Sequence, residues 1–503
     1  MKILTADEIK KTECKCFELY STEAELMLKA GTACYNEIVK KYGDSLKNSK
    51  VSVLCGNGKN AGDGFVIARL LYCYGADASI VICDKMPIIA EPAMYYEQAL
   101  NSGVKSVSFT EKIPDCDYIV DCMFGIGFHG EPRSPFDKIF SAVNETGAVV
   151  ISVDTPSGTD STLGSVCTDC IKADFTIAIS TLKYAHILPP ANDYCGDTVV
   201  VDIGISDDCY EPCDTNTIEK TFVRSLFHRQ NTNDNKGSRG TVLSLCGSYT
   251  MPGAAVFAAE SAIRSGAGLV RVTVPKSAYP LVECHTCQPV FHPVCENKSG
   301  TFSADTAEEI NDDLNRCDSI VMGCGVGIND DTEAFVRYVL KNANSPVILD
   351  ADGINCINRS IDILKDIKVP VVLTPHPGEM SRLVSKSVAE AQADRIGIAK
   401  NFAKSYGVVL VLKGANTVVT DGEKVFVNTT GNPAMAMGGS GDMLSGMIGA
   451  FVAQGVPSFD AAIAGVYIHG LCGDTAAAQI SSRGITVFDM IDRLGALMSE
   501  FEQ

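Results

Sequence analysis

The sequence predicts an α/β protein made of two domains, each built on a mostly parallel sheet. Short apolar segments alternate with amphipathic helical segments in both halves of the 503 residues, which is the pattern of strand–helix–strand units with right-handed crossovers. Each half also carries a glycine-rich turn between a predicted strand and a predicted helix. Between 204 and 220 the alternation stops in the polar, acidic stretch SDDCYEPCDTNTIEK. We therefore expect domains at 1–215 and 220–503.

The first glycine-rich turn lies in the segment VSVLCGNGKNAGDGFVIARLLYCYGA at 51–76. An apolar strand runs into Gly56 and Gly58 and then into a helix, and the spacing fits the loose G-x-G-x-x-A dinucleotide fingerprint. A tight βα turn without a ligand would have the same pattern. Asn60 and Asp63 argue against a pyrophosphate cradle, because a carboxylate repels phosphate, and they suit a cation or a hydroxylated ring.

Three later strands of this half end near side chains that can do chemistry. Asp121 and Asp154 each end an apolar strand, loops that contain glycine follow both, and Lys183 comes after the next strand. Any one of the acids could be a helix cap. Because the carboxyl ends of parallel strands meet at one edge of a sheet, we expect all three side chains to share an active site.

The second half repeats one arrangement several times, in which a buried strand leads into a polar turn. Open α/β sheets deliver such turns to one edge, where ligands bind. We expect the turns of this half to frame a second binding site. The segments lie at 235–272, 320–327, 349–355, 371–380 and 408–422.

The most informative segment of this half is MGGSGDMLSG at 437–446. Its glycines let backbone N–H groups converge into an anion-binding nest at the start of a helix, whose apolar face begins with Met443 and Leu444. Asp442 lies where a phosphate would dock, which is explained if it removes a proton from a hydroxyl that attacks the phosphorus. The alternative is a plain helix cap. The neighbouring turns favour phosphoryl transfer to a hydroxyl.

Taken in order, these motifs resemble the ADP-dependent NAD(P)H-hydrate dehydratases, a branch of the ribokinase-like fold. The resemblance covers 236–503 and rests on KGSRG, GSYTMPGAA, SGAGLV, GCGVG, DADGIN, TPHPGEM, KGANT and GGSGD, with Cys324 departing from the family's GPGxG turn. It implies Asp442 as the base of a phosphoryl transfer from ADP, with Mg²⁺ as a further candidate ligand. It also implies a hydrate-binding set (Ala255, Gly325, His376, Asp442) and an ADP-binding set (Lys413, Gly414, Ala415, Asn416, Thr417, Gly441).

The first half resembles the NAD(P)H-hydrate epimerase domain, a Rossmann-like three-layer αβα fold, over 1–205, and LMLKAG at 26–31 is part of the match. Lys59, Ala61 and Ile126 depart from the family's GNNGGDG and GTG turns. The resemblance implies a potassium ion held by Asn60, Asp121 and Ser157, beside which Lys59 adds a positive charge. The acid/base group is Asp121, Asp154 or Lys183, which the sequence does not rank. The implied hydrate contacts are Lys59, Asn60, Ala61, Gly62, Asp63, Gly125, Ile126, Gly127, Phe128, His129, Gly130, Glu131 and Asp154.

Together the two resemblances imply a bifunctional repair enzyme, an isomerase joined to a lyase, that acts on hydrated NADH and NADPH. The hydrate carries a hydroxyl at C6, next to the ring nitrogen, and hydroxide is a poor leaving group. Phosphorylation from ADP would convert it into phosphate, which the nitrogen lone pair then expels to restore the reduced cofactor. The epimerase would convert the R hydrate into the S hydrate that the second step accepts. We expect small-molecule substrates (NADHX, NADPHX and ADP) and a homo-oligomer.

Composition narrows the partners and the compartment. The net charge of −19, from 42 basic and 61 acidic residues, argues against a nucleic-acid partner. The absence of a long apolar run, together with the charged start MKILTADEIKKTECKC, predicts a cytoplasmic protein with no membrane partner. The 21 cysteines fit free thiols in a reducing compartment. Cys167-x-x-Cys170 and Cys284-x-x-Cys287 could be halves of a zinc site, but they fall in different predicted domains.

Three other functions fit parts of the pattern. The second half could belong to a vitamin kinase, such as a hydroxyethylthiazole or pyridoxal kinase, since GxGD is shared. TPHPGEM and KGANT favour the dehydratase, and use of ADP rather than ATP would decide. The first half could be a non-catalytic scaffold like the related domain of an mRNA decapping factor, against which Asp121, Asp154 and Lys183 argue. An NAD-dependent dehydrogenase would need a hydride-transfer site after Gly56, and no convincing one follows.

Overall fold

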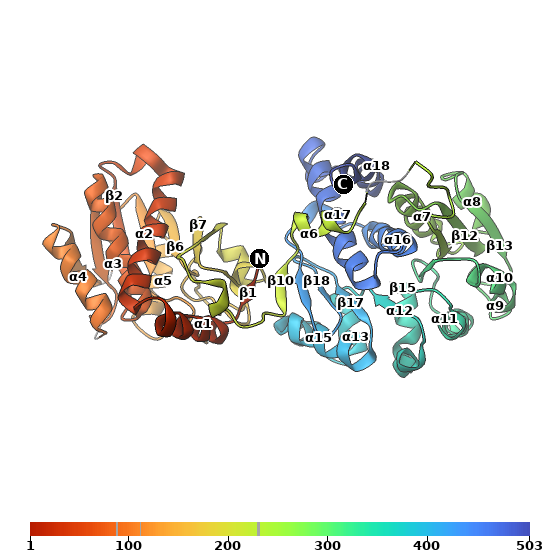
Figure 1. Cartoon of the computed structure of the whole chain (residues 1–503), viewed down its shortest axis with the longest axis horizontal. Helices are drawn as coiled ribbons and strands as arrows, with labels where there is room; N and C mark the ends of the chain where they lie inside the picture. The colour runs from red at the N-terminus through yellow and green to blue at the C-terminus, as the bar shows by residue number, and fades with distance from the viewer. Residues whose placement is uncertain (87–88, 111, 229–231, 503) are drawn as a thin grey trace. The chain divides into compact units, whose positions relative to one another are not determined.

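The computed structural model describes residues 1–86, 89–110, 112–228 and 232–502. The chain divides into two compact units, Met1–Thr215 and Asn216–Gln503, each with its own sheet and core. Figure 1 shows strands and helices alternating along both units. Among the described residues, no helix combines the length and the apolar character needed to cross a membrane.

The first unit is built on a seven-stranded, all-parallel sheet with the order β4-β3-β2-β5-β6-β7-β9. A separate parallel pair joins β1 (Ile3–Leu4) to β8 (Leu182–Lys183). The strands of the main sheet are β2 (Lys50–Cys55), β3 (Asp77–Ile82), β4 (Lys105–Ser108), β5 (Tyr118–Cys122), β6 (Val149–Val153), β7 (Phe175–Ile179) and β9 (Asp197–Val201).

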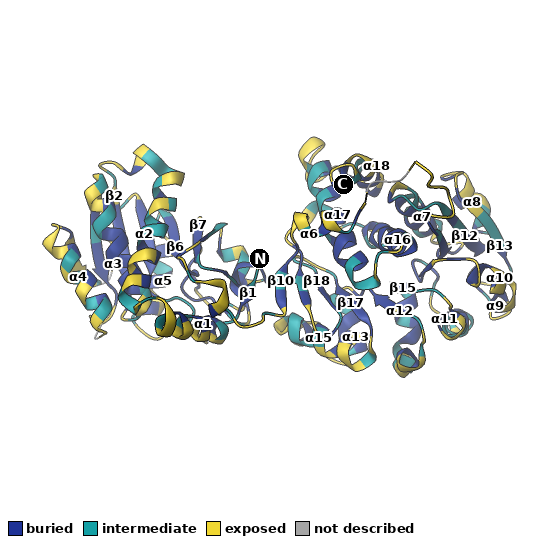
Figure 2. Cartoon of the chain, viewed as in Figure 1, coloured by how far each residue is buried: buried dark blue, intermediate teal, exposed yellow. Residues whose placement is uncertain are grey.

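Helices cover both faces of this sheet, because both sides of its strands are apolar. Val53 of β2 packs in a core with α2, α3 and α4, whereas its neighbour Leu54 packs in a second core with α5. Figure 2 shows the buried strands between partly exposed helices. The helices of this unit are α1 (Ala6–Leu19), α2 (Glu23–Tyr42), α3 (Lys59–Tyr74), α4 (Ala90–Asn101) and α5 (Phe136–Asn144).

The strand order reverses direction between β2 and β5. The chain runs from β2 outward to β3 and β4, and then returns to β5 on the other side of β2. In an open α/β sheet, such a switch point leaves a crevice at the carboxyl ends of the two strands. Gly56 sits there against the backbone, since a Cβ atom on it would lie 2.3 Å from the carbonyl oxygen of Met123.

The second unit is built on a ten-stranded sheet with the order β10-β19-β18-β17-β16-β15-β14-β11-β12-β13. The strands from β17 through β13 are mutually parallel, and β18 and β19 add an antiparallel hairpin. The bounds are β10 (Thr215–Thr217), β11 (Thr241–Leu245), β12 (Leu269–Pro275), β13 (Val290–Val294), β14 (Ser319–Met322), β15 (Val347–Leu349), β16 (Val371–Leu373), β17 (Val409–Leu412), β18 (Val418–Thr420) and β19 (Val425–Val427).

Two layers of helices enclose this sheet, as Figure 1 shows. One layer comprises α7 (Pro252–Arg264), α16 (Ser440–Ala453), α17 (Ser458–Gln479) and α18 (Val487–Met498). Val256, Met447 and Ile463 of these helices pack in the core that this layer forms with the sheet. The opposite layer comprises α11 (Asp330–Asn342), α12 (Asp352–Ile357), α13 (Pro377–Leu383) and α15 (Arg395–Tyr406). The shorter helices are α6 (Lys220–Ser225), α8 (Tyr279–Glu283), α9 (Thr306–Glu309), α10 (Asn311–Leu314) and α14 (Val388–Ala393).

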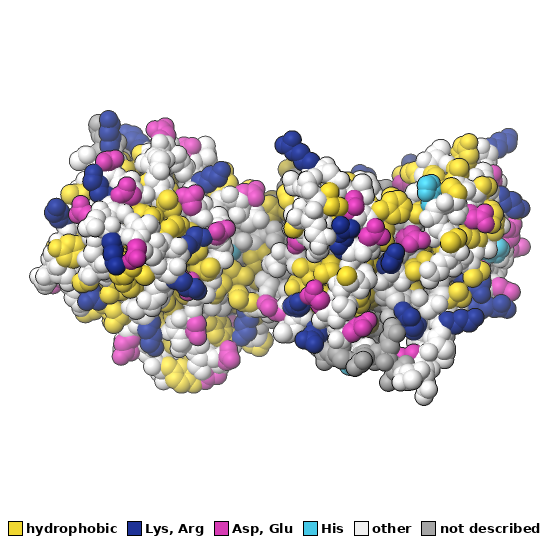
Figure 3. Space-filling model, turned by 90° about the horizontal axis from the view of Figure 1, so that it is seen from above, with side chains coloured by type: hydrophobic (Ala, Val, Ile, Leu, Met, Phe, Trp, Pro, Cys, Tyr) yellow, Lys and Arg dark blue, Asp and Glu magenta, His cyan; other side chains and the backbone are white. Residues whose placement is uncertain are grey.

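The predicted fold class, two α/β domains with parallel sheets, is confirmed. The stretch after Gly204 differs from the irregular linker that its composition predicts. It contains a short 3₁₀ turn at Asp207–Cys209 and the edge strand β10. Three residues of Thr-Asn-Thr are too short to give a strand pattern, so only pairing with β19 reveals this edge. Figure 3 shows acidic and basic side chains interspersed over the surface of both units.

Candidate active sites

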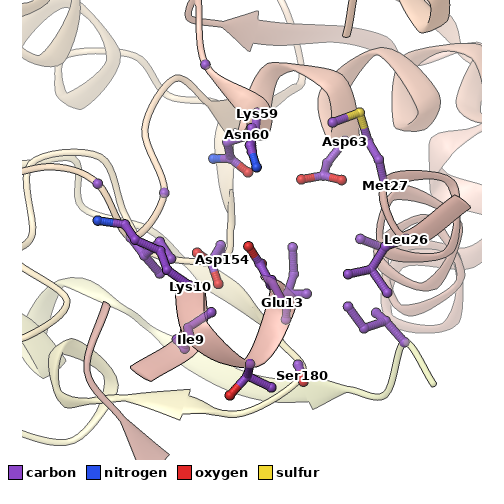
Figure 4. Close-up of a pocket in the computed structure, with 18 of the residues that line it drawn as sticks. Ile9, Lys10, Glu13, Leu26, Met27, Lys59, Asn60, Asp63, Asp154 and Ser180 are labelled. Atoms are coloured by element: carbon purple, nitrogen blue, oxygen red, sulfur yellow. The ribbon is translucent and has the colours of Figure 1, made fainter. Parts of the chain in front are cut away.

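A cavity of about 430 Å³ lies at the carboxyl edge of the first sheet. Its walls come from α1, α2, the turn before α3, the loop 123–128 and the segments after β6 and β7. Figure 4 shows Glu13 pointing into it from α1, with Asn60 and Asp63 facing Glu13 from α3. The switch point of the strand order therefore holds a chamber lined by titratable side chains.

Asp154 and Lys183, two of the three predicted catalytic candidates, form an ion pair on the wall of this cavity. Lys183 Nζ lies 2.5 Å from Asp154 Oδ1, and the Lys183 side chain is 1 % exposed. Asp154 has a φ of +70°, a left-handed backbone conformation that is costly for a residue other than glycine. Strain of this kind, at a charged pair inside a cavity, is typical of a functional site.

His186 holds that pair in place from behind. Its Nε2 lies 2.6 Å from the carbonyl oxygen of Asp154, and its Nδ1 accepts a hydrogen bond from the Lys183 backbone N–H at 2.9 Å. Burial lowers the pKa of His186 to about 4, and the charge of Lys183 adds to the fall. The imidazole is therefore neutral, with its proton on Nε2.

Two further acids face the cavity. Burial raises the pKa of Asp63 well above its ordinary value, and the charges of Asp154 and Glu13 raise it further. Burial also raises the pKa of Glu13, although Lys59 opposes the rise. The sequence reasoning missed Glu13. A signal exists, since Glu13 lies four residues after Ile9 and three before Cys16, both on the buried stripe of α1.

Asp121, the third predicted candidate, lies beneath the cavity and does not line it. Its carboxylate is 0 % exposed and accepts four hydrogen bonds, from Ser157 Oγ at 2.6 Å, Ser157 N at 2.8 Å, Ser152 Oγ at 3.0 Å and Met123 N at 3.2 Å. Ser157 Oγ also accepts the N–H of Phe124 at 3.0 Å. Asp121 therefore anchors the loop that forms the cavity wall.

Asn60 reaches the same loop from the other side. Its Nδ2 donates to the carbonyl oxygens of Phe124 at 3.0 Å and Val153 at 3.2 Å. Its Oδ1 is buried and has no hydrogen-bond partner among the described residues. The three predicted potassium ligands, Asn60, Asp121 and Ser157, are thus linked through the backbone N–H and carbonyl groups of Phe124.

The other predicted hydrate contacts divide into two groups. Lys59, Gly125, Ile126, Gly127 and Phe128 line the cavity, and Lys59 also pairs with Glu23 at 2.8 Å. Ala61, Gly62, His129, Gly130 and Glu131 do not line it. Burial in α3 accounts for the first two of these, and the other three follow Phe128 in an exposed loop.

The predicted phosphate nest of the second unit begins α16. Gly439 is the N-cap, with a φ of +94°, and Asp442 is the third residue of the helix, so the interpretation of Asp442 as a plain cap is wrong. Burial raises the pKa of Asp442 to about 6, and the charge of Asp350 adds to the rise. A carboxylate with this pKa is largely ionised near neutral pH and still basic enough to accept a proton.

Asp350 and Lys413 form an ion pair beside this helix. Lys413 Nζ lies 2.6 Å from Asp350 Oδ1, and Ser445 Oγ donates to Asp350 Oδ2 at 2.9 Å. Burial alone would raise the pKa of Asp350, but the charge of Lys413 lowers it. A Cβ atom on Gly441 would lie 3.0 Å from Lys413 Nζ, so a side chain at that position would crowd the ammonium group.

Cys324 completes this group. Oxygen atoms of Asp350 and Asp442 and the sulfur of Cys324 all lie within 4.8 Å of one another. The residues come from the ends of β14 and β15 and from the start of α16, where the strand ends of an open sheet place ligands. The substitution of cysteine in the GPGxG turn therefore puts a thiol beside the candidate base.

The predicted ADP-binding turn, 413–417, joins β17 to β18. Arg395 of α15 holds it, donating to the carbonyl oxygens of Ala415 at 2.9 Å and Lys413 at 3.2 Å. Thr417 Oγ1 donates to Gly414 O at 3.0 Å, and Asn416 Nδ2 donates to Asn428 O at 3.2 Å. Arg395, which is buried, was not identified from the sequence.

The predicted hydrate-binding residues of this unit differ in exposure. His376 is the N-cap of α13, and its Nδ1 accepts the N–H of Gly378 at 3.0 Å, while half of its side chain stays exposed. Burial lowers the pKa of His376, and Lys413 adds to the fall. Ala255 is fully buried in α7, and Gly325 has a φ of +64°.

Two acids of the DADGIN turn were not identified as site residues. Ala351, between Asp350 and Asp352, has a φ of +50° and a ψ of −119°, which alanine rarely adopts. The strained turn directs Asp350 toward Lys413 and lets Asp352 accept the N–H of Gly327 at 2.9 Å. The strand-then-turn pattern located this segment, but it could not show which acid faces the site.

Comparison with known proteins matches both units. A family model described as NAD(P)H-hydrate dehydratase matches residues 242–494, and one described as YjeF-related protein N-terminus matches residues 23–185. The chain is 33 % identical to a bifunctional NAD(P)H-hydrate repair enzyme, Nnr, of Coxiella burnetii over 98 % of each chain. It is 32 % identical to the Escherichia coli enzyme of the same name, over 98 % of this chain and 93 % of that one.

Among solved structures, an ADP/ATP-dependent NAD(P)H-hydrate dehydratase of Bacillus subtilis, co-crystallised with ATP and Mg²⁺, is similar to the second unit. It is 30 % identical with a TM-score of 0.50, over 57 % of this chain and 98 % of that one. A ribokinase-like protein of Enterococcus faecalis shares the fold, with a TM-score of 0.51 at 23 % identity, over 58 % of this chain and 97 % of that one. By these matches along its whole length, the chain belongs to the family of bifunctional NAD(P)H-hydrate repair enzymes.

Proposed function

We propose that this protein restores hydrated NADH and NADPH, with an epimerase in the first unit and an ADP-dependent dehydratase in the second. The observation that carries the proposal is Asp442, a partly buried carboxylate with a pKa of about 6 at the start of α16, beside the Asp350–Lys413 pair. A base at a helix N-terminus suits the transfer of a phosphoryl group to a hydroxyl. Full-length similarity to repair enzymes supports the same function.

In the dehydratase, Asp442 removes the proton of the C6 hydroxyl as that oxygen attacks the terminal phosphorus of ADP, and the bond from this phosphorus to the bridging oxygen breaks so that AMP leaves. The N–H groups of the nest around Gly439 and Gly441 stabilise the charge on the transferred group. The ammonium group of Lys413 lies beside Gly441 and adds positive charge next to the nest, while the ion pair with Asp350 fixes the position of the lysine. The ring nitrogen lone pair then expels phosphate as the C6–O bond breaks, and loss of a proton from C5 converts the resulting iminium ion into the reduced nicotinamide. Mg²⁺ bound to ADP would neutralise its phosphates.

In the epimerase, the C6 hydroxyl must leave from one face of the ring and return to the other, so proton donors are needed on two walls. Asp154 and Lys183 lie together on one wall as an ion pair. Glu13 and Asp63 face each other across the cavity (Figure 4), and burial keeps both carboxyls more protonated than usual. The cavity therefore offers acids on facing walls, as this chemistry requires.

The residues that would hold a potassium ion in this proposal are Asn60, Asp121 and Ser157. The Asn60 Oδ1 atom is a buried oxygen without a hydrogen-bond partner among the described residues, and such an atom is costly unless a cation or a donor satisfies it. Asp121 carries a buried carboxylate that Ser157 Oγ hydrogen-bonds, and Ser157 Oγ in turn accepts the N–H of Phe124 in the cavity loop. A bound ion would place a fixed positive charge next to the hydrate.

The proposal is tested with purified protein, mixed R and S hydrates and ADP, by following the absorbance of the restored reduced nicotinamide. Complete recovery is expected. Recovery that stops at the S fraction would remove the epimerase from the proposal, and no recovery with ADP would remove the dehydratase. Repeating the assay with ATP in place of ADP identifies the preferred donor.

Replacing Glu13 with Gln is expected to slow epimerisation by at least about tenfold, because the amide keeps the size of the side chain but cannot transfer a proton. The rate is measured as the loss of R hydrate while S hydrate and ADP support normal dehydration. Glu18→Gln, on an exposed position of the same helix, is the matched control and should epimerise like the wild type. An unchanged epimerisation rate in Glu13→Gln would show that Glu13 transfers no proton and that the other acids of the cavity suffice.

The two activities are expected to separate if the chain is cut after Thr215, the last residue of the first compact unit. The piece 1–215 should epimerise and the piece 216–503 should dehydrate pure S hydrate. A cut after Ser206 should instead abolish epimerisation, because it removes Tyr210, which lines the cavity and bonds to Ser180 at 2.5 Å. Loss of dehydration in 216–503 would mean that the second site needs the first unit.

A further inference from the structure

Cys167 and Cys170 form a buried dithiol next to the epimerase site. They lie between β6 and β7, are 4 % and 1 % exposed, and flank a turn whose two central residues, Thr168 and Asp169, are exposed. A Cβ atom on Gly158 would lie 2.7 Å from the sulfur of Cys167 and 3.2 Å from that of Cys170. The two thiols therefore meet over Gly158, and the nearby Cys170 thiol lowers the pKa of Cys167.

This dithiol is tied to the turn that carries Ser157. The Cys167 N–H donates to the carbonyl oxygen of Gly158 at 2.9 Å, and the Ile171 N–H donates to that of Ser157 at 3.0 Å. The Cys170 thiol also donates to the carbonyl oxygen of Ser157 at 3.6 Å. Ser157 in turn bonds to Asp121 and to the cavity loop at Phe124. Two hydrogen bonds therefore connect the Cys170 sulfur to the cavity wall, one from Cys170 to Ser157 and one from Phe124 to Ser157.

We propose that Cys167 and Cys170 are a redox site that hydroperoxides convert to a disulfide, and that this modification slows the epimerase. The inference rests on the proposed function of the first unit. Cysteines at the two ends of a four-residue turn have the short Cα separation that a disulfide needs. Neither thiol has a role in the proposed epimerisation or dehydration.

The reaction is balanced with hydrogen peroxide as the oxidant. The thiolate of Cys167, the more exposed of the two, attacks one peroxide oxygen, so that an S–O bond forms, the O–O bond breaks, and the departing hydroxide takes up the proton that Cys167 lost and leaves as water. The sulfur of Cys170 then attacks the Cys167 sulfur, so that the S–S bond forms, the S–O bond breaks, and the hydroxyl leaves with the Cys170 proton as a second water. Both sulfurs are oxidised and the peroxide is reduced.

Closing the bond removes one of the contacts that hold the Ser157 turn. A disulfide brings its sulfurs to about 2.05 Å and leaves Cys170 without the proton that it donates to the carbonyl oxygen of Ser157. Displacement of a positioning element by about 1 Å commonly costs up to about 10²-fold in rate. We expect epimerisation to fall between about 10- and 100-fold, and dehydration of pure S hydrate in the other unit to stay unchanged.

The test treats the full-length protein with hydrogen peroxide and follows two independent readouts. After alkylation, mass spectrometry of the peptide around 167–170 should show that its mass is two hydrogens lower than that of the reduced peptide. Neither cysteine should carry the alkylating group. Epimerisation should fall in parallel, and dithiothreitol should restore both. The mass readout needs no activity, so a failure of the proposed function is distinguishable from a failure of this inference.

Variants complete the test. Cys170→Ser and Cys170→Ala should keep their own starting epimerase rates after peroxide, whereas Cys287→Ser, which breaks the exposed Cys284-x-x-Cys287 pair, should lose activity like the wild type. Two alkylated thiols at Cys167 and Cys170 after peroxide would overturn the inference. So would a disulfide there with unchanged epimerisation, or equal loss of activity in the Cys170 variants.

Discussion

Asp442→Asn is expected to lower the rate of hydrate dehydration by roughly 10²–10⁴-fold while ADP still binds. The amide has the size of the carboxylate but cannot accept the proton of the C6 hydroxyl. Asp442 is the third residue of α16, so the backbone N–H groups of the nest stay in place. Single-turnover dehydration of S hydrate measures the rate, and calorimetry measures ADP affinity.

Stability provides the control for this variant. Burial raises the pKa of Asp442 above that of an unfolded chain, so its ionisation destabilises the fold as the pH rises through about 6. Asn removes that cost, and the melting temperature at pH 7 should not fall. Asp460→Asn, an acid in the first turn of α17, should dehydrate at the wild-type rate. Dehydration within a factor of two of wild type in Asp442→Asn would exclude this residue as the base.

The same pKa fixes the pH dependence of the second unit. A base must be ionised to act, so the wild-type dehydration rate should fall as the pH is lowered through about 6 and level off above it. Asp442→Asn should lose this limb and keep a low, flat profile. An unchanged limb in the variant would assign the titration to another group.

Asp154→Asn is expected to stop the conversion of mixed epimers once the S hydrate is used, at an unaltered initial rate. The substitution removes the charge that pairs with Lys183 at 2.5 Å and a carboxyl from the cavity wall. General acid–base catalysis commonly contributes 10²–10⁴-fold, so the remaining R hydrate should change at close to the spontaneous rate. The plateau is read from the absorbance of the reduced nicotinamide.

Two comparisons make the Asp154 result specific. Spontaneous epimerisation is measured without enzyme and subtracted. Asp137→Asn, on an exposed position of α5, should convert everything like the wild type. Fast, complete conversion by Asp154→Asn would show that the strained backbone at this residue serves only to end β6 and that its carboxylate is not needed for epimerisation.

Much of the architecture could be predicted from the sequence. The apolar strands that end at Asp121 and Asp154 are β5 and β6, and MGGSGDMLSG begins α16. These predictions depend on side-chain periodicity and glycine turns, which act within a few residues of chain. The gathering of strand ends at one edge followed from the parallel sheet. Asp121 shows the limit of that rule, because a strand-end carboxylate buried under a loop lies near a site without lining it.

The sequence by itself determined two α/β units, their glycine nests and the strand ends where chemistry is expected. Only the tertiary structure decided which side chains meet. Asp350 and Lys413 are 63 residues apart, and Glu13 reaches its cavity from a helix that precedes every strand of the main sheet. The pKa of Asp442 depends on burial and on Asp350, and both arise only when the sheet and the helix layers pack. Local sequence patterns fix secondary structure, whereas the electrostatic interaction between two charged groups depends on the distance that the packed fold places between them.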